Sequence, residues 1–304
     1  MKIKIKDEDM VDNLQHKSAA WRAISASNAA LLKISMALML CLTFMGVGNP
    51  MNAQAEDAPM RFDSPSADHP LPEIMSGYLY RDPTTQALQD DDFENPGMLW
   101  YERGEGLWTQ VDGAANKSCA DCHQDAAVSM KGVGASYPKW NDALEKPVTL
   151  EQQVNLCREN NMKADAWKWE SDQMLSTVIF VKRQSKGMPV TVQVDGPMEP
   201  HFENGKSVYY RRTGQLNMSC ANCHEDHYGD NIRSDHLSQG QSNGFPTYRL
   251  KNQGVLSLHK RFEGCIRDTR AEFPKRGDPD LVDLELYLAW RGQGLPVETP
   301  SVRH

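Results

Sequence analysis

The chain has 304 residues, of which 39% are hydrophobic, and its formal net charge at pH 7 is −8. This length exceeds the needs of a single small domain, so we expect one large or two modest domains with a packed core. The excess of acidic residues excludes the basic surface typical of nucleic-acid-binding proteins, and we expect no nucleic-acid partner.

The N-terminal segment has the pattern of a secretory signal. Lys33 precedes an apolar run over residues 34–47, and a small-residue sequence, Ala-Gln-Ala, follows at residues 53–55. The apolar run is shorter than the roughly 20 residues that a membrane-spanning helix needs. A retained membrane anchor is the alternative. We predict a signal peptide over residues 1–55 and a mature chain without a membrane anchor that begins at Glu56.

Two copies of the motif Cys-x-x-Cys-His follow. They consist of Cys119, Cys122 and His123 in the first copy, and of Cys220, Cys223 and His224 in the second. In c-type haem attachment the two thiols bond to the haem and the histidine binds its iron. A zinc site would have to gather four ligands from both motifs, and a redox dithiol does not need the histidine. Two such motifs behind an export signal predict two covalently bound haem c groups.

The sequences around the two motifs are similar. The motifs start 101 residues apart, at positions 119 and 220, and the segment EQQVNLCREN matches HKRFEGCIRD further along. Each half also ends alike, with SKGMPV in the first and GQGLPV in the second. Such self-similarity predicts an internal duplication. We expect an all-α, loop-rich fold of two tandem cytochrome c-like haem domains, residues 56–195 with an N-terminal extension and residues 196–304.

Helical periodicity is clearest near the end of each half. In the second half it predicts a helix that Asp280 caps and that two glycines end, with an apolar face made of Leu281, Leu284, Tyr287 and Leu288. In the first half, Ser171 or Asp172 caps a similar helix. The best candidate strand is VTVQV at residues 190–194, between the halves.

Each haem iron then needs a ligand on its second side. Met188 is a candidate because cytochromes c often use methionine, but its counterpart in the second half is Leu295, which cannot bind iron. Cys157 and Cys265 occupy matching places in both halves. We predict that they bind the first and the second iron, respectively. The alternative is a disulfide between them, although equivalent positions of two domains rarely meet at the short separation that a disulfide needs.

These features resemble the SoxA family, the dihaem cytochrome c subunit of the SoxAX complex (L-cysteine S-thiosulfotransferase) of sulfur-oxidising bacteria. The resemblance is carried by the two CAxCH motifs, by the Cys157 segment, and above all by KRFEGCIRDTRAE at residues 260–272. In that last segment Arg261 and Arg270 flank Cys265. The resemblance covers essentially the whole chain after the predicted signal peptide.

The resemblance implies an activity and its partners. The protein would form a heterodimer with SoxX, a smaller c-type cytochrome, in the periplasm. Together they would join thiosulfate oxidatively to a cysteine of the carrier protein SoxYZ and pass electrons to cytochrome c. Cys265 would be the active-site residue, with a cysteine persulfide as intermediate, and Arg261 would bind the substrate anion.

The chemistry of these two residues agrees with the implied roles. Arg261 lies four residues before Cys265, so on a helix both side chains share one face. A guanidinium presents a planar set of donors to the oxygens of a sulfonate. The competing interpretation is a dihaem electron-transfer cytochrome, or a peroxidase-like enzyme without sulfur-transfer activity.

Overall fold

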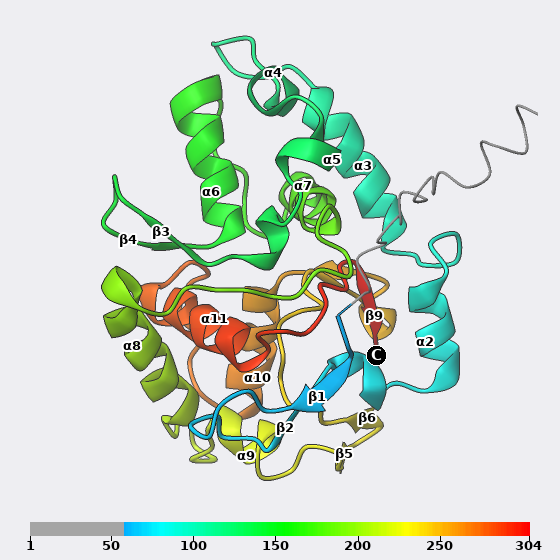
Figure 1. Ribbon diagram of the computed structural model, residues 1–304, viewed down its shortest axis with the longest axis vertical. Coiled ribbons are helices and arrows are strands. Elements are labelled where there is room, and N and C mark those ends of the chain that lie inside the picture. Colours follow the sequence, from blue (N-terminus) through cyan, green and yellow to red (C-terminus); the bar gives the residue numbers. More distant parts are fainter. Residues whose placement is uncertain (1–57) are drawn as a thin grey trace, which may run out of the picture. The chain divides into compact units, whose positions relative to one another are not determined.

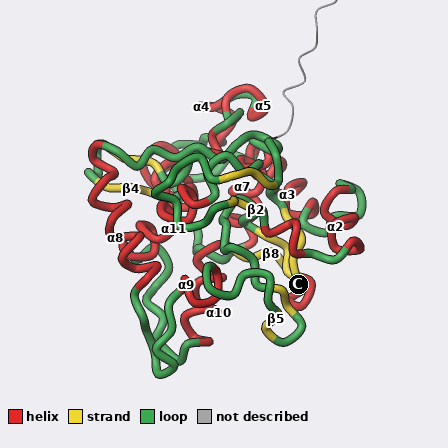
Figure 2. Tube along the Cα trace, turned by 60° about the horizontal axis from the view of Figure 1, so that its bottom comes forward, coloured by secondary structure: helices red, strands yellow, loops and turns green. Residues whose placement is uncertain are grey.

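The computed structural model describes residues 58–304, which belong to one compact unit over Glu56–His304. The predicted signal peptide lies outside the described residues. Helices dominate the structure and are joined by long loops (Figures 1 and 2). Short strands also form two-stranded and three-stranded sheets, so the expected helical character is confirmed while the all-α class is not.

The bounds of the elements are as follows. The helices are α2 (Pro83–Asp90), α3 (Met98–Thr109), α4 (Cys119–His123), α5 (Ala126–Ser129), α6 (Leu150–Cys157), α7 (Asp172–Arg183), α8 (Glu199–Tyr210), α9 (Cys220–His224), α10 (Leu258–Asp268) and α11 (Pro279–Arg291). The strands are β1 (Arg61–Asp63), β2 (Glu73–Met75), β3 (Lys139–Asn141), β4 (Lys146–Val148), β5 (Asn231–Ile232), β6 (Asp235–His236), β7 (Thr247–Arg249), β8 (Gly254–Leu256) and β9 (Ser301–Arg303).

A close helix crossing organises each half. In the first half α3 packs on α7, and in the second half α8 packs on α11. Gly104 of α3 and Gly205 of α8 lie at these crossings, where a Cβ atom would overlap the carbonyl oxygens of Ser176 and Asp283, respectively. The two glycines are 101 residues apart, like the two haem motifs. Both crossings therefore depend on a residue without a side chain.

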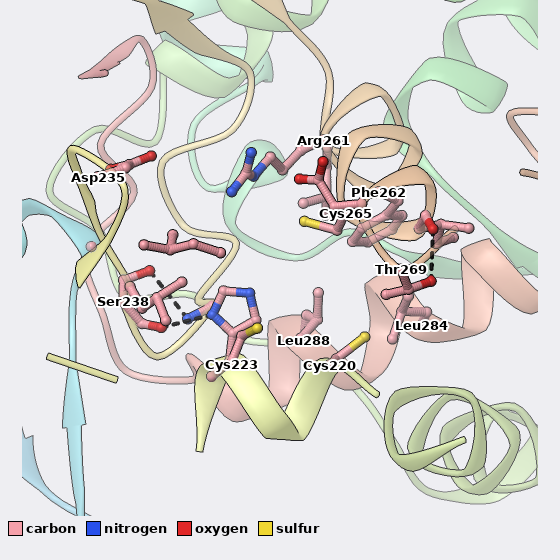
Figure 3. A pocket seen from close by; sticks show the side chains of 18 of the residues that line it. Cys220, Cys223, Asp235, Ser238, Arg261, Phe262, Cys265, Thr269, Leu284 and Leu288 are labelled. Carbon is pink, nitrogen blue, oxygen red and sulfur yellow. Dashed lines mark hydrogen bonds between the residues drawn. The ribbon is translucent and has the colours of Figure 1, made fainter. Parts of the chain in front are cut away.

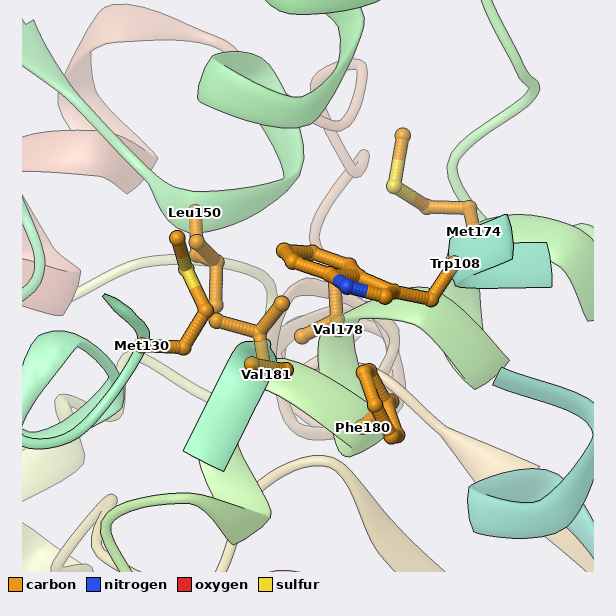
Figure 4. Close-up of a cluster of buried hydrophobic side chains, with 8 residues drawn as sticks. Trp108, Met130, Leu150, Met174, Val178, Phe180 and Val181 are labelled. Atoms are coloured by element: carbon orange, nitrogen blue, oxygen red, sulfur yellow. The ribbon is translucent and has the colours of Figure 1, made fainter. Parts of the chain in front are cut away.

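Each crossing is covered by its own apolar cluster. The cluster of the first half surrounds Trp108 (Figure 4) and also contains Ala126, Met130, Leu150, Met174, Val178, Phe180 and Val181. The cluster of the second half surrounds Tyr209, 101 residues after Trp108, and also contains Ala221, Leu258, Phe262, Leu281, Leu284, Tyr287 and Leu288. Both clusters include one cysteine of the neighbouring haem motif among their partly buried members.

Matching turns lead from each crossing to a haem motif. Gly113 and Gly214 have positive φ angles of 71° and 67°, and each packs against the backbone that follows the later cysteine of its half. A serine then caps the short helix of the motif in a capping box, Ser118 for α4 and Ser219 for α9. The repeated sequence therefore forms a repeated local structure.

The segments SKGMPV and GQGLPV pair with each other. Pro189 and Pro296 form an antiparallel bridge, and the Val190 amide donates to the Leu295 carbonyl at 2.8 Å. Val190, Val192 and Val297 also belong to a third apolar cluster together with Leu286 of α11. Residues 190–194, the best candidate strand, do not form a regular strand. Their backbone hydrogen bonds join them to Ala135, Gly294 and Leu295, and they belong to none of the sheets formed by residues 58–304.

The N-terminal extension contacts the second half. Gln239 accepts a hydrogen bond from the Met75 amide at 2.8 Å and donates one to the Glu73 carbonyl at 3.0 Å. Arg81 forms an ion pair with Asp235 at 2.7 Å. The extension precedes the first half in sequence, yet it contributes a buried cation to the neighbourhood of the second haem motif.

Two helix caps test the expected boundaries. Ser171 caps α7 by accepting a hydrogen bond from the Met174 amide, as predicted. The prediction that Asp280 caps the last helix was wrong, because α11 begins at Pro279 and its cap is Asp278. Proline is favoured in the first turn of a helix, where no amide proton is needed, and this moves the start of α11 towards the N-terminus.

Ionisable side chains are buried between the helices that carry the two later cysteines. Glu151 of α6 and His259 of α10 hold equivalent positions, six residues before Cys157 and Cys265. His259 stacks on Trp169 with a centroid separation of 4.7 Å, and its Nε2 lies 3.2 Å from the carboxylate of Glu285. Burial, followed by the nearby carboxylate of Glu285, raises the pKa of Glu151.

The helix crossings yield a first prediction. Gly104→Ala is expected to lower the free energy of unfolding by about 1–3 kcal/mol, because the added methyl group overlaps the backbone of α7. Gly106→Ala is the matched control, since a Cβ there meets nothing within 4 Å. The control is expected to stabilise α3 by about 0.5–1 kcal/mol. Thermal unfolding of the haem-loaded protein measures both, and equal stabilisation by the two changes would contradict the proposed role of Gly104.

The buried carboxylate yields a second prediction. A raised pKa means that folded Glu151 still holds its proton when the unfolded chain has released its own, near 4.5. The free energy of unfolding therefore falls as the pH rises from 4.5 to the folded-state pKa. Glu151→Gln is expected to remove this loss and so to gain stability over the wild type as the pH increases. Unfolding curves across the pH range measure it, with exposed Glu159→Gln as control; parallel curves for wild type and Glu151→Gln would refute it.

Candidate functional site

A cavity of about 1150 Å³ lies between α9 and α10. Cys220 and Cys223 approach it from α9, and Arg261 and Cys265 from α10 on the opposite side (Figure 3). Apolar side chains of α11, among them Leu288, also line it. The structure thus brings the second haem motif and the later cysteine of the same half to a single site, as the sequence predicted.

The short helix α9 presents both of its thiols to this cavity. Ser219 caps the helix, and its hydroxyl and amide hydrogen-bond the Asn222 side chain. Cys220 and Cys223 are three residues apart and so lie on one face of the helical turn. Burial, and then the nearby Cys265 thiol, raises the pKa of Cys220 to about 12, which keeps that thiol protonated in the protein before haem attachment.

His224 is held in a defined orientation. Its Nδ1 lies 2.7 Å from the Ser238 carbonyl, and a proton on Nδ1 leaves Nε2 unprotonated and free to bind a metal. Burial lowers the pKa of His224 to about 4, so the ring is neutral at physiological pH, as a ligand must be. Gly240, with a φ of 77°, packs directly on this ring.

The helix α10 places Arg261 and Cys265 side by side. Ser257 caps the helix by accepting a hydrogen bond from the Lys260 amide at 3.1 Å. The neighbouring sulfur of Cys265 is the main cause of a raised pKa for Arg261, so the two side chains lie close together. Arg267, on the exposed side of α10, forms an ion pair with Glu263 at 2.8 Å and points to no site.

These residues fit a haem c group. Two thiols one helical turn apart, a neutral histidine with an oriented ring and a facing thiol form a donor set that suits haem c. The largely apolar wall from α11 suits a flat apolar macrocycle. Among residues 58–304 no cluster of three or more His, Cys, Asp or Glu side chains has the arrangement of a site that binds a bare metal ion.

The first half holds the corresponding residues in α4 and α6. Burial, followed by the nearby Cys157 thiol, raises the pKa of Cys119, so this pair of cysteines also lies close together. The His123 ring lies 5.8 Å from the Trp108 ring, at the edge of the first apolar cluster. Cys122 is exposed. The first motif and Cys157 are therefore gathered into a second site, separate from the cavity.

The two sites differ at one equivalent position. Cys157 and Cys265 each lie eight residues after the cap of their helix, Thr149 in α6 and Ser257 in α10. Four residues before the cysteine the second site has Arg261, whereas the first has Gln153, whose Nε2 donates to Cys157 Sγ at 3.4 Å. The first site thus has a neutral amide where the second has a cation.

The structure bears on one of the two alternatives for the later cysteines, the disulfide. All six described cysteines are free, so Cys157 and Cys265 are not joined. Met188 lies where the two half-ends pair, and its carbonyl accepts a hydrogen bond from the Val297 amide at 2.9 Å. This backbone contact leaves iron binding by the Met188 side chain as an untested alternative. Its counterpart Leu295 is fully buried. Ligation of iron by Cys157 and Cys265 stays a prediction.

Sequence reasoning missed the polar residues that surround the cavity. Arg81, Asp235, Ser238 and Arg249 line it, and they come from the N-terminal extension, β6, the following loop and β7. They lie far from the haem motif and from Cys265 in sequence, and none belongs to a repeated pattern. Only the folded chain shows that they share a site.

Comparison with known proteins identifies the family. The family described as SoxA/TsdA, cytochrome c domain, matches residues 103–190. An L-cysteine S-thiosulfotransferase subunit SoxA from Pseudaminobacter salicylatoxidans is 49% identical over 269 residues, which cover 87% of this chain and 94% of that protein. The chain belongs to the SoxA family.

Other relatives agree with this assignment. The subunit SoxA of Paracoccus pantotrophus is 47% identical over 84% of this chain and 86% of that protein. A crystal structure of SoxXA from P. pantotrophus superposes with a TM-score of 0.78 at 47% identity and covers 81% of this chain and 94% of that one. The cytochrome c fold and its haem cofactor are thereby established for the SoxA family member described here, as the sequence predicted.

The contact between Gly240 and His224 yields a prediction. Gly240→Ala forces a methyl group against the ring and is expected to change its orientation, and hence the electron paramagnetic resonance signal of a ferric haem that His224 would bind. Gly229→Ala is the control, because Gly229 also has a positive φ, of 90°, but a Cβ there meets nothing within 4 Å. Equal spectra for both variants would show that Gly240 does not fix the ring.

Proposed function

We propose that this protein is the dihaem subunit of an L-cysteine S-thiosulfotransferase, which joins thiosulfate to a cysteine of the SoxYZ carrier protein. The observation that carries the proposal is the pair Arg261 and Cys265, side by side on α10 and facing a haem motif across one cavity. The names of the relatives at 47–49% identity support it.

The proposal includes two covalently bound haem c groups. The first would be attached to Cys119 and Cys122 and the second to Cys220 and Cys223. The axial ligands would be His123 and Cys157 for the first iron, and His224 and Cys265 for the second. Haem iron supplies a site that takes up electrons one at a time, and a thiolate ligand lowers its potential. The equivalent helix positions of Cys157 and Cys265 support this ligand set.

The reaction is an oxidative sulfur–sulfur bond formation. A carrier thiol and thiosulfate give a carrier cysteine S-thiosulfonate, one proton and two electrons. The bond that forms joins the carrier sulfur to the sulfane sulfur of thiosulfate, and the bond that breaks is the S–H bond of the carrier. Both electrons pass to an electron-accepting cytochrome c.

The residues of α10 have distinct roles in this proposal. Arg261 binds the sulfonate oxygens, since a guanidinium offers two parallel donors to such a group. Cys265 presents its sulfur to the sulfane sulfur of the bound anion. The cysteine persulfide proposed on Cys265 would keep its outer sulfur through this step, because moving the sulfane sulfur onto Cys265 would release sulfite and leave no thiosulfonate for the carrier. The close approach of the two side chains on one helical face keeps the anion beside the reacting sulfur.

The partners and the location follow from the family. We propose a heterodimer with SoxX, supported by the similarity to the SoxXA structure. We also propose export to the periplasm after removal of residues 1–55, supported by the signal-like sequence of that segment. None of the helices within residues 58–304 is both long and apolar enough to cross a membrane.

The proposal extends to the origin of the two halves. We assign residues 56–195 and 196–304 to two cytochrome c-like domains that arose by duplication. Two helix crossings, two positive-φ turns and two capped haem motifs, all offset by 101 residues, support it. The presence of Gln153 in place of an arginine supports assigning sulfur chemistry to the second half alone.

The central prediction concerns Cys265. Cys265→Ala is expected to keep both haems attached but to lower thiosulfate-dependent turnover on the order of 10³-fold or more, because the reacting sulfur is gone. Carrier conjugation, measured by the mass of the carrier protein, and acceptor reduction provide the measurements. Arg267→Gln on the same helix is the control and should retain turnover.

Two outcomes would contradict the proposal. Full carrier conjugation by Cys265→Ala would place the chemistry elsewhere. Reduction of hydrogen peroxide by the wild type, without any conjugation of thiosulfate, would instead favour the peroxidase-like alternative.

A further inference from the structure

The side chain of Arg249 lines the same cavity but comes from a different element than Arg261. Arg249 ends β7, which pairs with β8 on one side and with β9 on the other. The residue is only 5% exposed, and it lines the cavity together with Arg261 and Cys265. A sheet and a helix, both held by backbone hydrogen bonds, thus fix two guanidinium groups in one cavity.

Most of the donors of Arg249 have no hydrogen-bond partner in the part of the chain that the structure describes. Its Nε and Nη2 are buried and form no hydrogen bond. Nη2 lies 3.5 Å from the Asp235 carboxylate, close enough for an ion pair. That carboxylate already accepts a hydrogen bond from Arg81 at 2.7 Å. Arg249 therefore shares one carboxylate with a second buried arginine.

The cavity holds more buried positive than negative charge. Arg81 and Arg249 are buried and Arg261 is partly buried, whereas none of the carboxylates that line the cavity is fully buried. Asp235, Asp278 and Asp280 are partly buried, Asp268 and Glu272 are exposed, and Asp280 pairs with Arg211. Burial, followed by the neighbouring Arg261, lowers the pKa of Arg249 to about 10. A buried guanidinium with free donors and a cationic neighbour is costly unless an anion compensates it.

We propose that Arg249 is an anion-binding residue that works together with Arg261 to hold a divalent oxyanion beside Cys265. This inference rests on the proposed function and deepens it, since thiosulfate is such an anion. Arg249 and Arg261 approach from different elements, so they can contact different oxygens of a tetrahedral group. Nε and Nη2 form no hydrogen bond in the described chain, and together they offer donors that match adjacent oxygens of a sulfonate, with Nη2 also 3.5 Å from Asp235.

Sulfate is a suitable probe because it has the charge and oxygen geometry of the proposed ligand and does not react. Calorimetric titration of the haem-loaded protein, without carrier and acceptor, measures its affinity. Arg249→Gln is expected to weaken sulfate binding by about tenfold or more, the cost of losing charge-assisted hydrogen bonds. Arg249→Lys keeps the charge without the planar donors and should give an intermediate affinity. Thiosulfate should compete with sulfate in the wild type.

Lys251→Gln is the matched control. Lys251 lies two residues after Arg249 and lines the same cavity, but it is exposed, so its loss should change the affinity by less than about twofold. Equal affinities of Arg249→Gln and Lys251→Gln would overturn the inference. A shifted reduction potential of the second haem in Arg249→Gln, with unchanged sulfate affinity, would also overturn the inference. Arg249 would then form an ion pair with a carboxylate of the haem.

The role of Arg249 and the proposed function can be refuted independently of each other. Sulfate affinity is measured on the resting protein, so it does not require turnover. Normal sulfate binding by Arg249→Gln alongside thiosulfate turnover by the wild type would refute the role of Arg249 alone. Sulfate binding that depends on Arg249 in a protein that never conjugates thiosulfate would refute the proposed function alone.

Discussion

The contact between two helix backbones at a glycine is the constraint on which each half of this protein depends. At Gly104 and again at Gly205 the polypeptide approaches a neighbouring carbonyl so closely that a methyl group does not fit. This contact sets the crossing angle of the two helices and the distance between them. The turn that follows then positions the capped helix that carries the haem motif. The later cysteine then faces the motif because its helix is anchored in the same apolar cluster.

Much of this arrangement was predictable from short sequence motifs and from the internal repeat of the chain. The two haem motifs, the matching cysteines and the helical register of Arg261 with Cys265 follow from short patterns, because helix geometry alone places residues four apart on one face. The start of the last helix was harder to locate, since Asp278 and Asp280 are both good caps and only the position of Pro279 decides between them. Residues 190–194 have strand-like composition but no partner strand, which composition alone does not reveal.

The polar wall of the cavity was not predictable from the sequence. Arg81 comes from the N-terminal extension and Arg249 from a strand, and both meet Asp235 only after the chain has folded. No local spacing connects them, and arginine is usually an exposed residue. Their burial next to Cys265 is a tertiary property. It is also the property that gives the site its positive charge.

Gln153 distinguishes the cysteine site of the first half from that of the second. Two sulfur atoms occupy equivalent places on two helices, yet only one of them has a guanidinium one turn away. Under the proposed function, a doubly charged anion therefore has one binding site in a chain that carries two such cysteines. In the first half, the sulfur of Cys157 instead has a neutral amide beside it.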